Sequence, residues 1–454
     1  MHSVHIKTFG CQMNKRDSEA LASRLSSQGY LVTDSEQSAD VILINTCSVR
    51  DGAEQKALNK MRMLIGKSGQ QPRKPLFGFL GCMAQAHGEK LLEEIPGIKL
   101  VLGTHCSHKL PEYLDMLLKG EREKIADCGE MDAPPVFLKD HNLLQEGSEF
   151  PLVSAFVNIM HGCDQHCTYC IVPETRGKEF SRPIADIVDE CRSLAQYGVK
   201  EVTLLGQIVT SYGKRLISAS PEGLSPFVQL LEEVEKVEGL ERIRFTSPHP
   251  KGYGLDLVEA YGRLSKLCES AHLPLQSGSN RILKAMRRGY TAERFLEILS
   301  QLRSVRPSIG LVTDIIVGFP GETEEDFQET MNLVRTARFD NAFIFKYSPR
   351  QHTPATEMPE QVPMEIREER HARLLALVNE IAQEAYQHKV GETLDVLVEG
   401  LSRRNVNRLQ GRSRCNKIVL FEGPSAWVGT IRKFRIVRAG QYSLYGEPIE
   451  TEDN

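Results

Sequence analysis

Residues 161–177 read HGCDQHCTYCIVPETRG and contain three cysteines within eight positions. Cys163, Cys167 and Cys170 follow the spacing C-x-x-x-C-x-x-C, so a single short loop can wrap three thiolates around one small metal centre. An iron-sulfur cubane has four corners that are normally held by four thiolates. Three thiolates would leave one iron open to a small molecule, and the spacing favours such a centre.

Zinc is the main alternative for this loop. Structural zinc sites are closed by four ligands, and His161 and His166 are the nearby side chains that could complete one. Neither histidine belongs to a second C-x-x-C or H-x-x-x-H pair. A disulfide is disfavoured, because the composition predicts a chain that stays in the cytosol.

The composition is that of an ordinary globular protein. The chain has 454 residues, 41% of them hydrophobic and 26% charged, which is enough for two or three domains. No apolar run approaches the roughly 20 residues of a membrane span, and the N-terminus lacks the pattern of a signal peptide. Eleven scattered cysteines predict a cytoplasmic protein with reduced thiols. The net charge of −4 means that any RNA contact must come from a local basic patch.

Alternating strand and helix patterns predict an α/β fold with three domains and a linker. In residues 1–125, apolar runs alternate with helical patterns such as residues 17–30, which is typical of a parallel sheet. The polar stretch 126–148, which includes Pro134 and Pro135, is interpreted as a linker. The strands expected in the first domain are 4–10, 41–46 and 75–81.

The alternation continues in residues 149–382 and stops in residues 386–454. About six strand-helix units and the absence of G-x-G-x-x-G favour a full or partial barrel over a dinucleotide-binding sheet. The last segment has short strands and turns, which predict a small all-β barrel. The expected strands are 152–160, 199–206, 243–247, 271–276, 309–318 and 341–348, and then 393–402, 417–424, 427–439 and 442–449.

Three further cysteines each stand just past an expected strand. Cys11, Cys47 and Cys82 end the runs IKTFGC, LINTC and FLGC. Because the carboxyl ends of parallel strands lie along one edge, these thiols should share that edge. The alternative is three separately buried cysteines, and the repeated placement favours a shared metal centre. The other cysteines are interpreted as structural: Cys106, Cys128, Cys191, Cys268 and Cys415.

The cysteine loop, with an aromatic residue before its last cysteine, resembles that of the radical S-adenosylmethionine (SAM) enzymes. The stretches TFGCQMN, INTCSVR, FLGCMAQ, TRGKEFSRP, RFTSPHP, HLPLQSGSNRIL and IVGFPGETEEDF are similar to those of the methylthiotransferase family. The segment with VEGLSRRN and LQGRSRCNKIV resembles the family's TRAM RNA-binding barrel. The resemblance covers nearly the whole chain.

This resemblance implies two 4Fe-4S clusters. Cys163, Cys167 and Cys170 would hold one, whose fourth iron binds SAM, and cleavage of SAM would give a 5′-deoxyadenosyl radical. By the same resemblance, the cysteines at the three strand ends, Cys11, Cys47 and Cys82, would hold an auxiliary cluster that carries the sulfur to be transferred.

The sequence GCQMN resembles the branch of the family that acts on isopentenyladenosine next to the tRNA anticodon. Two departures from that branch, residues 208–212 and His352, could reshape the substrate pocket. The alternatives are another modified adenosine, a ribosomal protein, or a non-catalytic iron-sulfur protein that binds RNA. The implied partners are this tRNA and an electron donor such as a flavodoxin or ferredoxin, with no membrane and a monomeric chain.

Several other side chains have expected roles. Tyr169, Gly206, Gln276 and Asp314 are expected to line the SAM site, although a strand end or a core hydrogen bond explains the last three equally well. Helix caps are predicted at Asn14 and Asp17. Trp427 is expected in a strand and in the core.

The last segment is locally basic in a chain of negative net charge. This reversal favours contact with RNA phosphates over a merely solvated face. The basic residues are Arg403, Arg404, Arg408, Arg412, Arg414, Lys417, Arg432, Lys433, Arg435 and Arg438.

Overall fold

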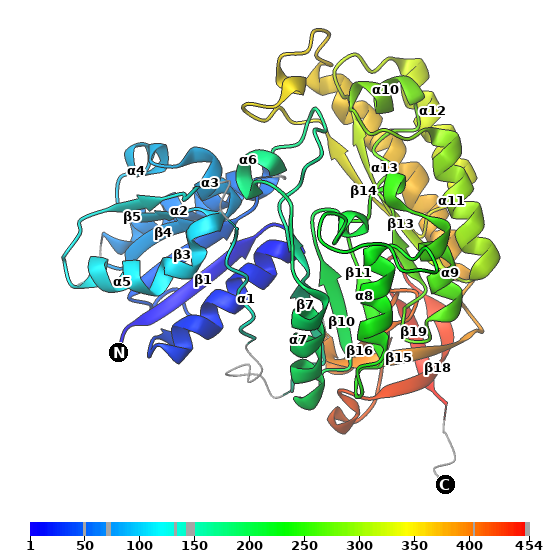
Figure 1. The fold of residues 1–454 in the computed structure, drawn as a ribbon, viewed down its shortest axis with the longest axis horizontal. Helices are drawn as coiled ribbons and strands as arrows, with labels where there is room; N and C mark the ends of the chain where they lie inside the picture. Colours follow the sequence, from blue (N-terminus) through cyan, green and yellow to red (C-terminus); the bar gives the residue numbers. More distant parts are fainter. Residues whose placement is uncertain (49–50, 70–73, 131–133, 142–149, 403–404, 450–454) are drawn as a thin grey trace.

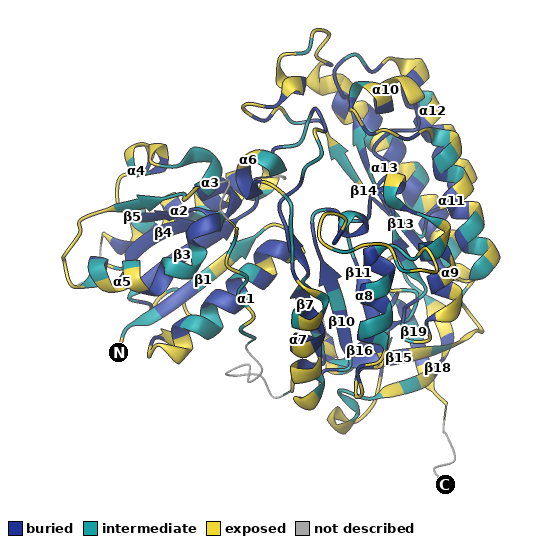
Figure 2. Cartoon of the chain, viewed as in Figure 1, coloured by how far each residue is buried: buried dark blue, intermediate teal, exposed yellow. Residues whose placement is uncertain are grey.

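The chain folds into three consecutive parts, each built on β-strands (Figure 1). The computed structural model describes residues 1–48, 51–69, 74–130, 134–141, 150–402 and 405–449. Figure 2 shows that the strands are largely buried, whereas exposed residues lie on the outer helices and connecting loops. No described helix is long and apolar enough to cross a membrane.

The N-terminal part is a six-stranded sheet in the order β2-β1-β3-β4-β5-β6, with every pairing parallel. Successive residues of a strand face opposite sides, and β3 (Val41–Thr46) is apolar on both, so helices cover both faces. The other strands are β1 (Ser3–Phe9), β2 (Leu31–Val32), β4 (Leu76–Leu80), β5 (Ile98–Leu102) and β6 (Ile125–Asp127).

Two hydrophobic clusters hold this sheet between its helices. On one face, Val41 and Leu43 pack with Leu21 and Leu25 of α1 (Gln12–Ser27) and with α5 (Leu110–Leu118). The opposite cluster joins the sheet to α2 (Asp51–Ser68), α3 (Cys82–His87) and α4 (Lys90–Glu94). The expected parallel α/β domain is confirmed, and β6 continues two residues beyond position 125, where the linker was expected to begin.

The central part is an open barrel of six parallel strands. Its strands form two three-stranded sheets, β7-β10-β11 and β12-β13-β14, which meet at a bridge between Ile243 and Leu267 and at the contact of β11 with β12. The strands are β7 (Ser154–Asn158), β10 (Glu201–Leu205), β11 (Arg242–Phe245), β12 (Ser270–His272), β13 (Gly310–Val317) and β14 (Asn341–Lys346). The expectation of a partial barrel is confirmed.

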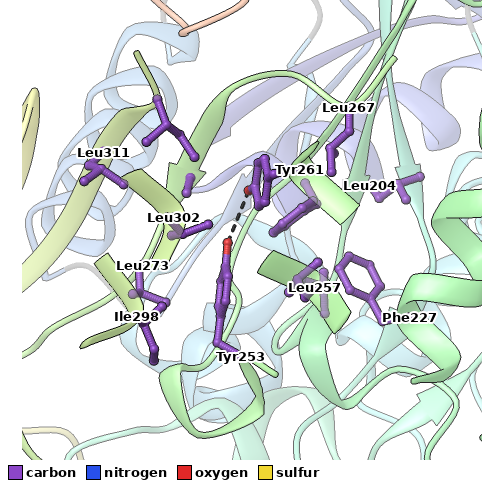
Figure 3. Packing of buried hydrophobic residues seen from close by; sticks show 14 of the residues in the cluster. Leu204, Phe227, Tyr253, Leu257, Tyr261, Leu267, Leu273, Ile298, Leu302 and Leu311 are labelled. Atoms are coloured by element: carbon purple, nitrogen blue, oxygen red, sulfur yellow. Dashed lines mark hydrogen bonds between the residues drawn. The ribbon is translucent and has the colours of Figure 1, made fainter. Parts of the chain in front are cut away.

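Amphipathic helices cover the outside of this barrel. One continuous core joins them to the strands, and within it the hydroxyls of Tyr253 and Tyr261 form a 3.2 Å hydrogen bond (Figure 3). This core fixes the strand ends that carry the polar residues. The helices are α7 (Ile184–Gln196), α8 (Pro226–Glu235), α9 (Leu255–Arg263), α10 (Asn280–Ala285), α11 (Ala292–Val305), α12 (Glu324–Ala337) and α13 (Met364–Gln387).

The C-terminal part is a closed five-stranded barrel in the order β15-β16-β17-β19-β18. The sequence predicted four of its strands, and β16 was missed because its stretch NVNRLQGRS is polar rather than alternating. Trp427 lies in the short 3-10 helix Ser425–Trp427 and is only partly buried, so its placement in a strand was wrong. The strands are β15 (Thr393–Ser402), β16 (Asn405–Ser413), β17 (Ile418–Phe421), β18 (Ile431–Ala439) and β19 (Leu444–Pro448).

Candidate active site

A cavity of about 2430 Å³ is lined by residues of all three parts. Both groups of cysteines reach its wall: Cys11, Cys47 and Cys82 from the N-terminal sheet, and Cys170 from the central loop. Ligand pockets are usually about 300–1,000 Å³, so this cavity has room for more than one small molecule.

The first three cysteines lie at the carboxyl edge of three neighbouring strands. Cys11 follows β1 and precedes α1, Cys47 follows β3, and Cys82 opens α3 after β4. The strands pair in the order β1-β3-β4, so the expected juxtaposition of these residues at one edge is seen. This group is called the N-terminal triad below.

Two glycines allow the strand ends to come this close. A Cβ at Gly10 would lie 2.4 Å from the Cβ of Cys47, and one at Gly81 would lie 2.1 Å from Oδ1 of Asn45. Gly81 also has φ +86°, a backbone conformation that residues with a Cβ rarely adopt. The residue before Cys11 and the residue before Cys82 must therefore be small for the triad to form.

Buried amides fix the Cys11 side of the triad. The Cys11 thiol donates to Oδ1 of Asn14 at 3.1 Å, and Nδ2 of Asn14 donates to Oδ1 of Asn45, also at 3.1 Å. Asn45 in turn donates to the Ser18 hydroxyl at 2.8 Å. The prediction that Asn14 caps the helix was wrong, because α1 begins two residues earlier and Asn14 lies within it, fully buried.

An arginine from the central part completes this site. α6 (Val172–Arg176) follows the cysteine loop and packs on the N-terminal part against α3 (Figure 1). The Arg176 side chain is only 3% exposed, and its Nη2 donates to Oδ2 of Asp17 at 2.7 Å. The prediction of a cap at Asp17 was therefore also wrong. The sequence showed the TRG stretch beside the loop but gave no sign that it reaches the other triad.

The electrostatics of the N-terminal triad favour thiolate formation at one position. A hydrogen bond with Cys47 is the main factor that lowers the pKa of the Cys11 thiol to about 6, and the charge of Arg176 lowers it further. Burial raises the pKa of the Cys82 thiol. A metal centre would deprotonate the remaining thiols, since coordinated thiols lose their protons.

The central triad of Cys163, Cys167 and Cys170 lies in the loop between β8 (Met160–His161) and α6. The loop is held by its backbone, because the Cys163 amide donates to the Gly177 carbonyl at 3.0 Å and the Cys170 amide to the Cys167 carbonyl at 3.1 Å. Burial raises the pKa of the Cys163 thiol to about 12 and that of Cys170 to about 11.

A second buried arginine contacts this central triad. Nη1 of Arg288 donates to the sulfur of Cys167 at 3.3 Å, and its Nε donates to the Tyr290 hydroxyl at 3.3 Å. Each triad therefore has one buried guanidinium beside it. Sequence reasoning missed Arg288, which lies in a run of basic residues after α10 with no motif of its own.

The zinc alternative finds no support in the arrangement of ligands. His161 packs edge-on against His105, with ring centres 5.3 Å apart, and His166 is exposed. Among the described residues, no three His, Cys, Asp or Glu side chains are grouped to hold a single metal ion. An iron-sulfur cubane spaces its ligands more widely because each binds a different iron, so two sets of three thiols fit it as a donor set.

All four residues expected near SAM line the same cavity as Cys170, namely Tyr169, Gly206, Gln276 and Asp314. Gly206 directly follows β10, and a Cβ there would lie 2.5 Å from Cγ of Met160. Sequence reasoning missed His272, whose Nε2 lies 3.1 Å from Oδ2 of Asp314 on the cavity wall. The sequence feature that could have identified His272 is its position in the expected strand AHLPLQ.

The two departures from the family pattern do not line this cavity, although the neighbouring Gln207 and Arg350 do. In residues 208–212, Val209, Thr210 and Tyr212 are buried, and the Tyr212 hydroxyl donates to the Arg182 carbonyl at 2.6 Å. His352 is exposed and has φ +64°. Neither departure is among the described residues that line the cavity.

Seven basic residues of the C-terminal barrel divide into two groups, and an eighth, Arg408, lies 3.7 Å from Glu422. Arg414 pairs with Glu269 at 2.7 Å and Lys417 pairs with Asp340, so these two fasten the barrel to the central part. Arg412 pairs with Glu399 within the barrel at 3.0 Å. These three residues therefore have partners within the protein, and their contact with RNA phosphates stays a prediction.

A second group of basic residues lies on β18. Arg432 lies over the Trp427 ring at 4.5 Å and Arg438 over the Tyr445 ring at 3.5 Å. Lys433 and Arg435 of β18 are exposed. Arg403 and Arg404 lie outside the described residues.

Family models match three consecutive parts of the chain. The model of an uncharacterized protein family, UPF0004, matches residues 3–103, the radical SAM superfamily matches residues 157–334, and the TRAM domain matches residues 387–449.

Known proteins match the chain over nearly its whole length. The tRNA-2-methylthio-N(6)-dimethylallyladenosine synthase of Opitutus terrae is 48% identical, over 98% of this chain and 97% of its own. The protein of the same name from Akkermansia muciniphila is 47% identical, over 99% of both chains. The solved radical S-adenosylmethionine methyltransferase TsrM of Kitasatospora setae, with cobalamin and a [4Fe-4S] cluster bound, covers 78% of this chain and 77% of its own with a TM-score of 0.54. At 15% identity this is a likeness of fold alone.

Proposed function

The chain belongs to the family of the tRNA-2-methylthio-N(6)-dimethylallyladenosine synthases, and on that premise we propose that it transfers a methylthio group to carbon 2 of isopentenyladenosine next to the tRNA anticodon. One observation carries the proposal: the N-terminal triad and Cys170 of the central triad, which come from different domains, line a single cavity that the C-terminal barrel also lines. A reaction that brings a radical source and a sulfur source to one base needs such an arrangement.

The cofactors follow from the donor sets. Cys163, Cys167 and Cys170 would hold a 4Fe-4S cluster that binds SAM, and the N-terminal triad would hold a second 4Fe-4S cluster. When bound, these groups would supply the carbon radical and the sulfur atom that modification of an inert aromatic C–H bond requires. We assign Tyr169, Gly206, Gln276 and Asp314 to the SAM site.

Hydrogen bonds within the protein hold the two triads in fixed positions relative to each other. The buried amides of Asn14 and Asn45 keep Cys11 in place, and α6 is bound to the N-terminal part by the Thr104 hydroxyl, which donates to the Thr175 carbonyl at 2.6 Å. Arg288 directs a hydrogen bond to Cys167. Because these groups are preorganised by packing, the substrate does not need to assemble the site.

The C-terminal barrel would bind the tRNA. Its strand β18 places Arg432 and Arg438 over aromatic rings, and stacked cations of this kind suit phosphates and unpaired bases. The proposal includes a domain division at 1–125, 149–382 and 386–454 with a linker at 126–148. It further includes an electron donor such as a flavodoxin or ferredoxin, a monomeric chain and a cytoplasmic location.

Nucleoside analysis of tRNA from a strain that lacks this chain tests the proposal. The 2-methylthio form of isopentenyladenosine should disappear while the unthiolated nucleoside accumulates, and expression of the wild-type chain should restore it. Loss of a different modified adenosine would contradict the substrate. If the purified protein holds two clusters but forms no 5′-deoxyadenosine from SAM and a reductant, it is not a radical enzyme.

A further inference from the structure

One nitrogen of Arg176 has no partner among the residues that the structure describes. Nη1 is buried and makes no hydrogen bond with any described residue, whereas Nη2 is bound by Asp17. A buried, charged donor without a partner is costly, so it calls for a water, an ion or a ligand that accepts its hydrogen bond. The side chain is 97% buried and lines the cavity together with the N-terminal triad.

This nitrogen differs from the other unpartnered guanidinium nitrogens. Within the described part of the chain, those others are Nε atoms, and none of their residues lines the cavity. The five are Arg16, Arg24, Arg242, Arg370 and Arg432. Arg176 alone among them offers a terminal N–H at the cavity wall.

Two cysteines of the N-terminal triad and one carboxylate surround Arg176. Its electrostatic neighbours are Cys82, Cys11 and Asp17. At the central triad, the corresponding arginine is Arg288, and its Nη1 donates a hydrogen bond to the sulfur of Cys167. Arg176 also hydrogen-bonds the Cys82 thiol, which opposes the rise in the pKa of that thiol, but its Nη1 makes no hydrogen bond with a described residue and can donate to a further anion.

Docking of α6 does not require the Arg176 side chain. The Thr104 hydroxyl donates to the Thr175 carbonyl, and Nε2 of His105 lies 3.2 Å from the Arg176 carbonyl. Both contacts use backbone oxygens and hold α6 on the N-terminal part whatever side chain stands at position 176. The buried guanidinium therefore calls for another explanation.

We propose that Arg176 is the anion-binding group of the N-terminal triad and donates its Nη1–H to the small sulfur anion, hydrosulfide or methanethiolate, that this site receives. The inference rests on the proposed function, which places a sulfur-carrying cluster there. A charge-assisted hydrogen bond from a fixed guanidinium is about twice as strong as a neutral one and selects a negatively charged sulfur over a neutral thiol. Arg176 is thus a positioning residue for the sulfur that is transferred.

The test measures binding of methanethiolate to the full-length protein with both clusters loaded. Binding is monitored through the change in the EPR signal of the reduced auxiliary cluster. Arg176→Met should weaken binding at least about tenfold with the iron content unchanged, and Arg176→Lys should restore part of it. Arg288→Met is the matched control, since it removes a buried guanidinium from the other triad and should leave methanethiolate binding as in wild type.

A second variant separates anion binding from a purely structural bridge. Asp17→Asn breaks the same ion pair but leaves Nη1 in place, so it should bind methanethiolate nearly as wild type does. Equal weakening by Asp17→Asn and Arg176→Met, wild-type binding by Arg176→Met, or loss of iron in both Arg176 variants would each overturn the inference. If wild-type protein itself holds no auxiliary cluster, the proposed function fails, and that result is distinct from all of these.

Discussion

Arg176 and Asp17 lie 159 positions apart and form a 2.7 Å hydrogen bond between Nη2 and Oδ2. One residue follows the central cysteine loop and the other lies in the helix that follows Cys11. This contact joins the two triads into one site.

Close packing at the strand ends predicts the effect of a single methyl group. Gly81→Ala places a Cβ where Oδ1 of Asn45 lies 2.1 Å away, so it should displace the N-terminal triad and remove about four irons per chain. Gly29→Ala is a matched control, because Gly29 has the same φ of +86° with nothing within 4 Å. The control should lose only about 1–2 kcal/mol of stability from backbone strain. Equal iron in both variants would contradict the role of close approach.

The hydrogen bond from Arg288 to Cys167 predicts a redox effect. Hydrogen bonds to cluster sulfurs and nearby positive charge raise the reduction potential, so Arg288→Met should lower the midpoint potential of the central cluster. An EPR-monitored redox titration measures this, and the auxiliary cluster in the same sample serves as the internal control. An unchanged central potential would show that Arg288 has only a packing role.

The two groups of basic residues on the C-terminal barrel should behave differently. Arg432→Ala and Arg438→Ala should each weaken tRNA binding and reduce the slope of log K against log salt by about 0.7–0.9, the value for one lost phosphate contact. Arg414→Ala removes the 2.7 Å ion pair with Glu269 and should mainly lower the melting temperature. A full salt slope in the Arg432 and Arg438 variants would mean that this face is only solvated.

The sequence alone predicts where a residue lies when its position follows from a local pattern. Cys11, Cys47 and Cys82 could be placed together because each ends a strand of one parallel sheet, and adjacent strands share an edge. The strand β16 escaped detection because its stretch is polar, and Leu409 is the one large apolar side chain among its three buried residues. The division of the chain into a sheet, an open barrel and a small barrel needed only periodicity and turn residues.

Contacts between domains could not be predicted in this way. Asn14 and Asp17 were assigned as caps because polar residues near a helix start usually cap it, but their partners are Asn45 and Arg176. Asn45 lies in strand β3, and Arg176 lies in the central part of the chain. Similarly, the basic composition of the C-terminal barrel did not reveal that Arg414 and Lys417 are held by carboxylates of the central part.

Iron and product measured on Cys82→Ala test the central claim most directly. If the N-terminal triad holds one auxiliary cluster, this variant should lose about four irons, keep SAM cleavage at the central triad, and make no methylthio product. Cys11→Ala and Cys47→Ala should behave alike, whereas Cys191→Ala, a buried core cysteine, should keep all its iron and lose only a little stability. A full complement of iron with normal product in Cys82→Ala would contradict the two-cluster account.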